Sequence, residues 1–384
     1  MKIAIAGVGL RSSHVLSIFQ SLEPDLEFVG YFDPQPTHLY EIDAAMPGFD
    51  SAASMLNQTK PDLFFIGSPN IFHLEHIRAG LESNVPHIFT EKPVVISIEE
   101  TLALSELLAK HSGVSRVMVG LVLRYSQHMM DLRSALDAGV LGPITSLEAN
   151  EHIAPYHGSF FMRDWRRKSS LSGGFILEKC CHDLDLYNWI TGSRPTRVAS
   201  FGGKRSFVAE HAHLTEKEQE IFSSKPSVWQ AAEDAFTADG DIIDFQTALL
   251  EYETGASLAF HTNSNVPDEH RRFCVMGAKG MAEGDFVRGY LKVTQRDGSV
   301  YMDRDYRADG LKQSKAHYGA DHRMVANILQ HLKNASTPLP VSIVDALEAG
   351  IAALALDQAR INRQVVELGR TWDAFDSYGL RIER

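Results

Sequence analysis

Short β-branched and aromatic runs alternate with amphipathic stretches through residues 1–123, and this alternation restricts the fold more than any other feature of the chain. Strands separated by helices are joined by crossover connections, so the pattern predicts a parallel sheet buried on both faces. The expected strands are residues 2–6, 26–33, 63–68, 87–90 and 116–123, and the expected helices are residues 12–21, 70–81 and 97–111. The fold class is therefore α/β, beginning with a doubly wound parallel sheet of the Rossmann type.

The pattern changes near residue 124, where longer alternating runs begin. After a helix over 132–138, the expected strands are residues 144–153, 196–207, 245–253, 256–262, 271–276 and 291–295, and the expected helices are residues 171–190, 321–334 and 341–368. Glu253-Thr254-Gly255 is typical of a hairpin turn, and the polar segment 210–230 is typical of an insertion that forms a flap or an oligomer contact. We therefore expect a second α/β domain over 124–384, with an open and mainly antiparallel sheet whose exposed face pairs subunits into a homodimer or homotetramer.

Charge and composition exclude several classes of partner. A net charge of -12 over 384 residues argues against binding to nucleic acid or to anionic lipid. The apolar run at the N-terminus is too short for a signal peptide, and no run approaches a membrane span. With 3 cysteines, two of them adjacent, a disulfide framework is not expected, so we expect a cytoplasmic protein.

The first strand leads into the loop Gly7-Val8-Gly9-Leu10-Arg11-Ser12, which precedes a helix. Glycine at 7 permits a tight turn, and glycine at 9 lets the backbone approach a pyrophosphate bound at the helix N-terminus. Serine occupies the place of the usual third glycine, but Asp33 ends the second strand, where a carboxylate accepts hydrogen bonds from ribose hydroxyls and repels a 2′-phosphate. The loop therefore predicts a dinucleotide site that prefers NAD to NADP.

Glu91-Lys92-Pro93 follows the strand expected over 87–90. Ligands of doubly wound sheets bind beyond the carboxyl ends of the strands, so Lys92 is expected where a nicotinamide and a substrate meet. A lone lysine at such a place is more often a solvated surface residue. A cis peptide bond before Pro93 is compatible with this sequence.

The segment 173–185, Gly-Gly-Phe-Ile-Leu-Glu-Lys-Cys-Cys-His-Asp-Leu-Asp, concentrates titratable side chains on a predicted helix. Helical spacing places Glu178, His182 and Asp185 on one stripe, which suits acid and base chemistry because a carboxylate one turn away can orient an imidazole. The alternatives are a polar helix that faces water, and a metal site formed by these three residues with Cys181. Adjacent cysteines diverge on a helix, so no metal is expected.

Taken together, these motifs resemble the Gfo/Idh/MocA family of sugar and inositol dehydrogenases. The likeness includes Ser68-Pro69-Asn70 at the end of the strand 63–68, Arg124-Tyr125 at the domain junction and Trp165-Arg166 ahead of the two glycines. The family often has aspartate and glycine where this chain has Glu178 and Cys180. The resemblance implies an active site between the two domains, with Lys92 and His182 as the catalytic pair and Glu178 completing the group.

The expected reaction is hydride transfer between NAD(P) and a secondary hydroxyl of a sugar, polyol or inositol. The expected cofactor-binding residues are Gly7, Gly9, Leu10, Arg11, Ser12, Asp33, Ser68, Pro69, Asn70, Glu91 and Lys92. The expected substrate-binding residues are Lys92, Arg124, Trp165, Arg166, Asp185 and His317. Two alternatives are an NAD-dependent glycosidase that works by transient oxidation and elimination, and a non-catalytic nucleotide-binding regulator. The basic segment 156–168 is either a loop that grips the substrate or a solvated loop.

Overall fold

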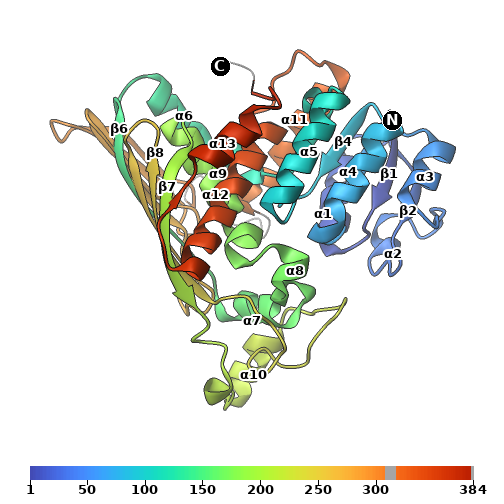
Figure 1. The fold of residues 1–384 in the computed structure, drawn as a ribbon, viewed down its shortest axis with the longest axis horizontal. Coiled ribbons are helices and arrows are strands. Elements are labelled where there is room, and N and C mark those ends of the chain that lie inside the picture. The colour runs from blue at the N-terminus through green and yellow to red at the C-terminus, as the bar shows by residue number, and fades with distance from the viewer. Residues whose placement is uncertain (308–316, 382–384) are drawn as a thin grey trace. The chain divides into compact units, whose positions relative to one another are not determined.

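The computed structural model describes residues 1–307 and 317–381 (Figure 1). The chain forms two compact units. The first comprises residues 1–125, 320–350 and 371–384, and the second comprises residues 126–319 and 351–370. The sequence pattern placed the end of the first domain at residue 123, and the first stretch of the first unit ends at residue 125. Two C-terminal segments also belong to the first unit.

The first unit is built on a parallel sheet, as the alternating pattern predicts. Its strands are β1 (Lys2–Ala6), β2 (Glu27–Phe32), β3 (Leu63–Ile66), β4 (His87–Thr90) and β5 (Val117–Val119), in the order β2-β1-β3-β4-β5. All four neighbouring pairs are parallel. Every residue of β3 is buried, which explains why the strand has no polar alternation.

A single parallel bridge between Tyr31 and Gly48 extends this sheet beyond β2. Tyr31 donates its N–H to Pro47 O and accepts at its own carbonyl from Phe49 N–H, at 3.0 and 2.9 Å. Counting this bridge as a shortened third strand gives the order 3-2-1-4-5-6 of the Rossmann fold. In that numbering β3 is the fourth strand and β4 the fifth.

Helices surround this sheet (Figure 1). They are α1 (Leu10–Leu22), α2 (Leu39–Ile42), α3 (Ala52–Thr59), α4 (His73–Glu82), α5 (Ile98–Lys110) and α11 (Ala320–Lys333), with short 3₁₀ turns at Asn70–Phe72, Gly113–Ser115 and Val122–Tyr125. Ser51 and Ser97 cap α3 and α5 by accepting from the N–H groups of Ser54 and Glu100. The sequence pattern missed α3, whose hydrophobic face is only three buried residues wide.

The second unit is built on a nine-stranded sheet of the described residues, in the order β13-β12-β11-β10-β6-β9-β8-β7-β14. Its strands are β6 (Ile144–His152), β7 (Pro195–Gly203), β8 (Phe245–Tyr252), β9 (Ser257–Asn263), β10 (Arg272–Gly277), β11 (Gly280–Asp285), β12 (Tyr290–Gln295), β13 (Val300–Asp305) and β14 (Val366–Glu367). Neighbours are antiparallel except β6 and β9. The hairpin expected at 253–255 joins β8 to β9, with Gly255 at φ +82°.

The helices of the second unit include α6 (Gln127–Asp137), α7 (Pro155–Arg163), α8 (Ser169–Ser172), α9 (Phe175–Thr191) and α10 (Glu216–Ser223). Two C-terminal helices, α12 (Ile343–Asn362) and α13 (Gly369–Asp376), contribute residues to both units. Several expected boundaries were wrong: the strand expected over 116–123 ends at Val119, and the strand expected over 196–207 ends at Gly203. The helix expected over 171–190 is interrupted by Gly173 and Gly174, both at positive φ, and the helix expected over 341–368 ends at Asn362 before β14.

The polar segment between β7 and β8 folds as a small insertion. The Asp244 carboxylate closes its base by accepting N–H groups of Arg205, Ser206 and Phe207. A capping box at Thr215 and Glu218 starts α10, which packs against α7. Apolar side chains of the insertion join a core shared with α7 and α9; its buried members are Ile153, Phe161, Met162, Phe175, Phe207, Ala235, Phe236, Ile242 and Ile243.

Candidate functional site

The loop between β1 and α1 has the geometry of an anion cradle. Gly7 lies at φ +88°, and a Cβ there would approach Ser68 N to 2.3 Å, so only glycine fits. Gly9 is the N-cap of α1 without a side-chain cap, and a Cβ there would meet nothing within 4 Å. The first amides of α1 therefore face open space at the positive end of the helix dipole, and these features fit a bound pyrophosphate.

Asp33 ties the end of β2 to this loop. Its Oδ2 accepts from Val8 N–H at 2.6 Å, and its Oδ1 accepts from Gln35 N–H at 2.7 Å. A carboxylate has about four acceptor positions, so both oxygens retain a lone pair for ribose hydroxyls. The carboxylate thus holds the loop and keeps its negative charge beside it.

Arg11, in the first turn of α1, joins three parts of the first unit. Its Nε donates to Glu91 Oε1 at 2.8 Å, and its NH2 group donates to Asp321 Oδ1 at 2.7 Å. Both carboxylates are buried, and their charges raise the pKa of the guanidinium although burial opposes the shift. Arg11 therefore connects the glycine loop, the residue before Lys92 and the start of α11. Asp321 was not among the site residues expected from the sequence, because its partner is 310 positions away.

The segments after β3 and β4 are joined by a buried histidine. His73 contacts Ser68 O through Nε2 and Pro93 O through Nδ1, both at 2.8 Å. Lys92 is half-buried and is followed by a cis peptide bond to Pro93. Asn70 is buried in the 3₁₀ turn that follows Pro69. The expected motifs 68–70 and 91–93 are therefore neighbours at the carboxyl edge of the sheet.

Arg124 is buried within the first unit. Its NH1 group donates to Pro340 O at 2.7 Å, and its NH2 group lies 3.4 Å from Asp345 Oδ1. Through these contacts Arg124 holds the C-terminal segment around residues 340–345, which belongs to the first unit. A substrate contact for Arg124 stays a prediction.

In the second unit, α9 begins at a constrained glycine. Gly174 lies at φ +94°, and a Cβ there would approach Asp357 Oδ2 to 2.5 Å. Arg360 holds that carboxylate through its Nε at 3.1 Å, and burial raises the pKa of Asp357. The close approach of Asp357 explains the double glycine that precedes the titratable stripe.

The stripe expected on α9 is present and buried. Glu178, His182 and Asp185 are each less than 5% exposed, at 3%, 4% and 1%. Arg166 donates from Nε to Glu178 Oε1 at 2.8 Å and from NH1 to Asp164 Oδ1 at 2.7 Å. Burial opposes the charge of Arg166, but the two carboxylates raise the pKa of its guanidinium. The acid of the stripe is therefore held by an arginine that precedes it by 12 residues.

The rings of His182 and His317 lie 5.8 Å apart between centroids. His317, Tyr318 and Gly319 all have positive φ, at 44°, 58° and 79°. Consecutive left-handed residues other than glycine are strained, and such strain is concentrated at functional sites. The structure thus places the His317 ring beside that of His182, and a role of His317 in substrate binding stays a prediction.

A second face of α9 holds an ion cluster. Arg271 binds Asp183 with Nε and NH2 at 2.9 and 2.6 Å, and its Nε lies 2.9 Å from Glu151 Oε2. Lys179 pairs with the other oxygen of Glu151 at 2.8 Å. The two cations balance the charge of the two carboxylates. Because Lys179 and Asp183 are held on this face of α9, the helix is fixed in rotation and residues 178 and 182 lie on a different face.

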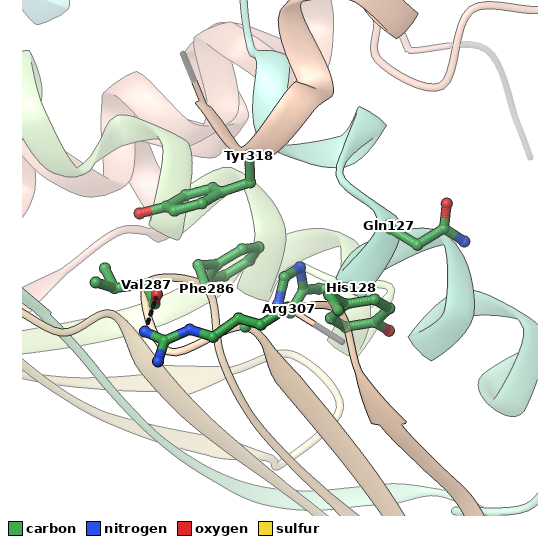
Figure 2. A pocket seen from close by; sticks show the side chains of 8 residues that line it. Gln127, His128, Phe286, Val287, Arg307 and Tyr318 are labelled. Carbon is green, nitrogen blue, oxygen red and sulfur yellow. Dashed lines mark hydrogen bonds between the residues drawn. The ribbon is translucent and has the colours of Figure 1, made fainter. Parts of the chain in front are cut away.

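Figure 2 shows a small pocket in the second unit. It is lined by Gln127, His128, Phe286, Val287, Gly289, Tyr306, Arg307 and Tyr318. The rings of Tyr318 and Phe286 lie over one another, 5.7 Å apart, and Arg307 donates to Val287 O at 3.0 Å (Figure 2). The pocket continues the aromatic packing that supports Tyr318.

The basic segment 156–168 was expected to be either a loop that grips the substrate or a solvated loop; the solvated loop is wrong, and a contact to the substrate stays a prediction. Its first part is α7, and its arginines are anchored in the protein. Arg163 donates to Phe222 O and Lys225 O at 3.0 and 2.8 Å, and Arg167 donates to Gln230 O and to Asp239 Oδ1. These side chains therefore dock the insertion onto α7.

Cys180 and Cys181 are buried on α9, and neither is bonded to another cysteine of the described residues. Over residues 1–307 and 317–381, no group of three or more His, Cys, Asp or Glu side chains has the arrangement of a metal site. Across the same residues, no helix combines the length and apolarity that a bilayer crossing requires.

Sequence comparisons identify the class of protein. Residues 1–121 match the NAD-binding Rossmann domain of the GFO/IDH/MocA oxidoreductase family, and residues 129–283 match the C-terminal domain of that family. The chain belongs to this family, and it is an NAD(P)-dependent dehydrogenase by class.

Particular relatives agree with this assignment. The chain is 30% identical over 305 residues to scyllo-inositol 2-dehydrogenase (NAD(+)) of Bacillus subtilis, covering 76% of this chain and 74% of the relative. It is 28% identical over 204 residues to D-glucoside 3-dehydrogenase of Escherichia coli, covering 50% and 54%. The crystal structure of scyllo-inositol dehydrogenase from Lactobacillus casei with bound NAD(H) and scyllo-inositol has the same fold, with a TM-score of 0.68, 20% identity and coverage of 96% and 99%.

Proposed function

We propose that this chain oxidises a secondary hydroxyl of a sugar, polyol or inositol with NAD. The observation that carries the proposal is the buried stripe of α9, where Glu178 and His182 share one face in a member of an NAD-binding family. Relatives named for inositol and glucoside oxidation support this choice of substrate class.

The cofactor would be held by the first unit. The amides of Leu10, Arg11 and Ser12 and the Gly7–Gly9 loop would bind the pyrophosphate, because they lie at the uncapped N-terminus of α1. Asp33 would accept the ribose hydroxyls, and its charge would repel a 2′-phosphate, which favours NAD over NADP. Ser68, Pro69, Asn70, Glu91 and Lys92 would line the rest of the site at the carboxyl edge of the sheet.

When bound, the nicotinamide ring supplies the acceptor for the hydride that leaves the substrate carbon. His182 takes the proton of the reacting hydroxyl as general base, and Lys92 donates a hydrogen bond to the same oxygen as the carbonyl forms. Both groups must approach that oxygen to about 2.6–3.2 Å in the productive complex. Asp185 and His317 are further candidates for contacts to the substrate.

Glu178 would orient His182 and stabilise its protonated form. Arg166 acts on Glu178 in turn, because its guanidinium binds Glu178 and Asp164 together and stays charged. This places Arg166 as a positioning residue one step behind the base.

The test is release of cofactor from the denatured protein, identified by mass, followed by NADH absorbance with a panel of free hexoses, inositols and glycosides. Accumulation of NADH supports the proposal. Tightly bound NAD together with glycoside cleavage and no net NADH would replace it with the oxidation and elimination route.

Self-association is a further part of the proposal. On the sheet of the second unit, Phe201 and Leu249 are 73% and 54% exposed, on strands whose alternate residues are buried. An apolar face of this kind is unfavourable in water and suits a second copy of the chain. Light scattering of the Leu249→Asp variant, compared with the unmodified protein, measures whether the oligomer depends on this face.

A further inference from the structure

The insertion over residues 204–244 carries an aromatic side chain, Trp229, that packs against Trp165. Trp229 is half-buried, and its ring centroid lies 6.1 Å from that of Trp165 in an edge-to-face arrangement. The guanidinium carbon of Arg166 lies 4.3 Å from the centroid of Trp165, and Arg166 binds Glu178. Three consecutive contacts therefore connect the insertion to the candidate acid.

The position of Trp229 is fixed at several points. Arg167 donates to the carbonyl of Gln230, the next residue along the chain. Ala232 N–H donates to Arg163 O at 2.8 Å, and Arg163 donates to Lys225 O on the other side of Trp229. The segment around the indole is therefore attached to α7 on both sides.

The charges of this region are already used within the protein. Arg166 faces two carboxylates, Arg163 faces backbone carbonyls, and Arg167 and Lys168 both pair with Asp239. A substrate with an acidic substituent would have to displace these partners. The half-buried indole of Trp229 lies beside this neutralised cluster, and this chemistry suits an uncharged ring.

We propose that Trp229 is a specificity-determining residue that stacks on the second ring of a glycoside while the first ring is oxidised. The C–H face of a pyranose, or the face of an aryl group, is attracted to the negative face of an indole. This inference rests on the proposed dehydrogenase function and narrows it, because a free inositol or hexose has no second ring to reach Trp229.

The experiment compares full-length protein with the variants Trp229→Ala, Trp229→Phe and Val228→Ala. The kcat/KM with NAD is measured for D-glucose, D-galactose and D-mannose and for the phenyl glycoside of each. Binding of the same compounds to the NAD-loaded protein is measured by saturation-transfer NMR, and thermal unfolding reports on folding. Val228 is an exposed neighbour and serves as the matched control.

We expect the unmodified protein to prefer phenyl glycosides to free hexoses, and Trp229→Ala to reduce this preference about tenfold, which corresponds to about 1.4 kcal/mol. Trp229→Phe keeps part of the preference, and Val228→Ala keeps all of it. The inference is overturned if the unmodified protein shows no preference in either rate or binding, or if Trp229→Ala weakens both compound classes equally. NADH production from free hexoses in that case leaves the proposed function standing. Absence of NADH from these compounds and also from a panel of inositols and polyols removes that function.

Discussion

Arg166 Nε lies 2.8 Å from Glu178 Oε1, and the same guanidinium holds Asp164 at 2.7 Å. The planar fork of arginine matches two carboxylates at once, and the ammonium group of lysine does not. The pairing gives the candidate acid a fixed orientation at the N-terminal turn of α9.

The Arg166→Lys variant tests this arrangement. We expect kcat/KM to fall about 10- to 100-fold, since a 1 Å change in a positioned group has effects of that order. A less firmly held Glu178 also stabilises the protonated form of His182 less, so the acid limb of the pH–kcat/KM profile, which reports the base, should move to lower pH. A uniform loss at all pH values, with no movement of the limb, would indicate a purely structural role.

His182→Ala and Lys92→Met test the proposed catalytic pair. Each should lower kcat about 10²- to 10⁴-fold, as removal of a general base or of an oxyanion donor does. If both groups act on one oxygen, the double variant loses less than the product of the single losses. Stopped-flow rates of hydride transfer measure this, and NADH fluorescence titration checks that cofactor affinity is retained. The exposed His213 provides a matched control as His213→Asn.

Asp33→Asn tests the preference for NAD. The KM for NAD should rise about tenfold, and the ratio of kcat/KM for NAD over NADP should fall, since the amide carries no charge to repel a 2′-phosphate. The exposed Asp25→Asn variant serves as control for charge alone. An unchanged NAD/NADP ratio would show that Asp33 only braces the glycine loop through Val8 N–H.

His76 predicts a pH dependence of stability. Burial lowers the pKa of His76 to about 4, with the charge of His73 as a smaller cause, and its Nδ1 lies 3.0 Å from Ser68 Oγ. The unfolded chain binds a proton near pH 6.5 and the folded chain does not, so the free energy of unfolding falls as the pH drops from 6.5 toward 4.

The size of this effect can be measured by urea unfolding at pH 7 and pH 5. The difference in unfolding free energy between the two pH values should be about 2 kcal/mol larger for the unmodified protein than for His76→Gln. The exposed His213→Gln variant should behave like the unmodified protein. If the unfolding free energy changes by the same amount between pH 7 and pH 5 in His76→Gln and in the unmodified protein, the buried imidazole of His76 is not neutral in the folded state.

The sequence pattern predicted the parallel sheet well, because strands buried on both faces leave long apolar runs between glycine and polar turns. It also predicted the stripe of α9, because helical periodicity alone brings residues 178, 182 and 185 together. Contacts between residues remote in the sequence could not be predicted, because they depend on the path of the whole chain. Examples are the ion pairs of Arg11 with Asp321 and of Arg271 with Asp183, and the approach of Asp357 to Gly174.

The basic segment shows why composition misleads. Arg163 and Arg167 have the same sequence signature as a solvated or ligand-gripping loop, but their hydrogen bonds go to backbone carbonyls about 60 residues later. A charge pattern contains no information on whether its acceptors are water, ligand or the protein backbone.

The same anchoring has an evolutionary consequence. Arg163 and Arg167 recognise the carbonyls of Phe222, Lys225 and Gln230, and every residue type carries that carbonyl. Side chains between these points can be exchanged without removing the hydrogen bonds that attach the segment. Proteins that descend from this one can therefore change the residue at position 229 while the proposed catalytic residues on α9 stay the same. The substrate specificity can then evolve without a change in the reaction that is catalysed.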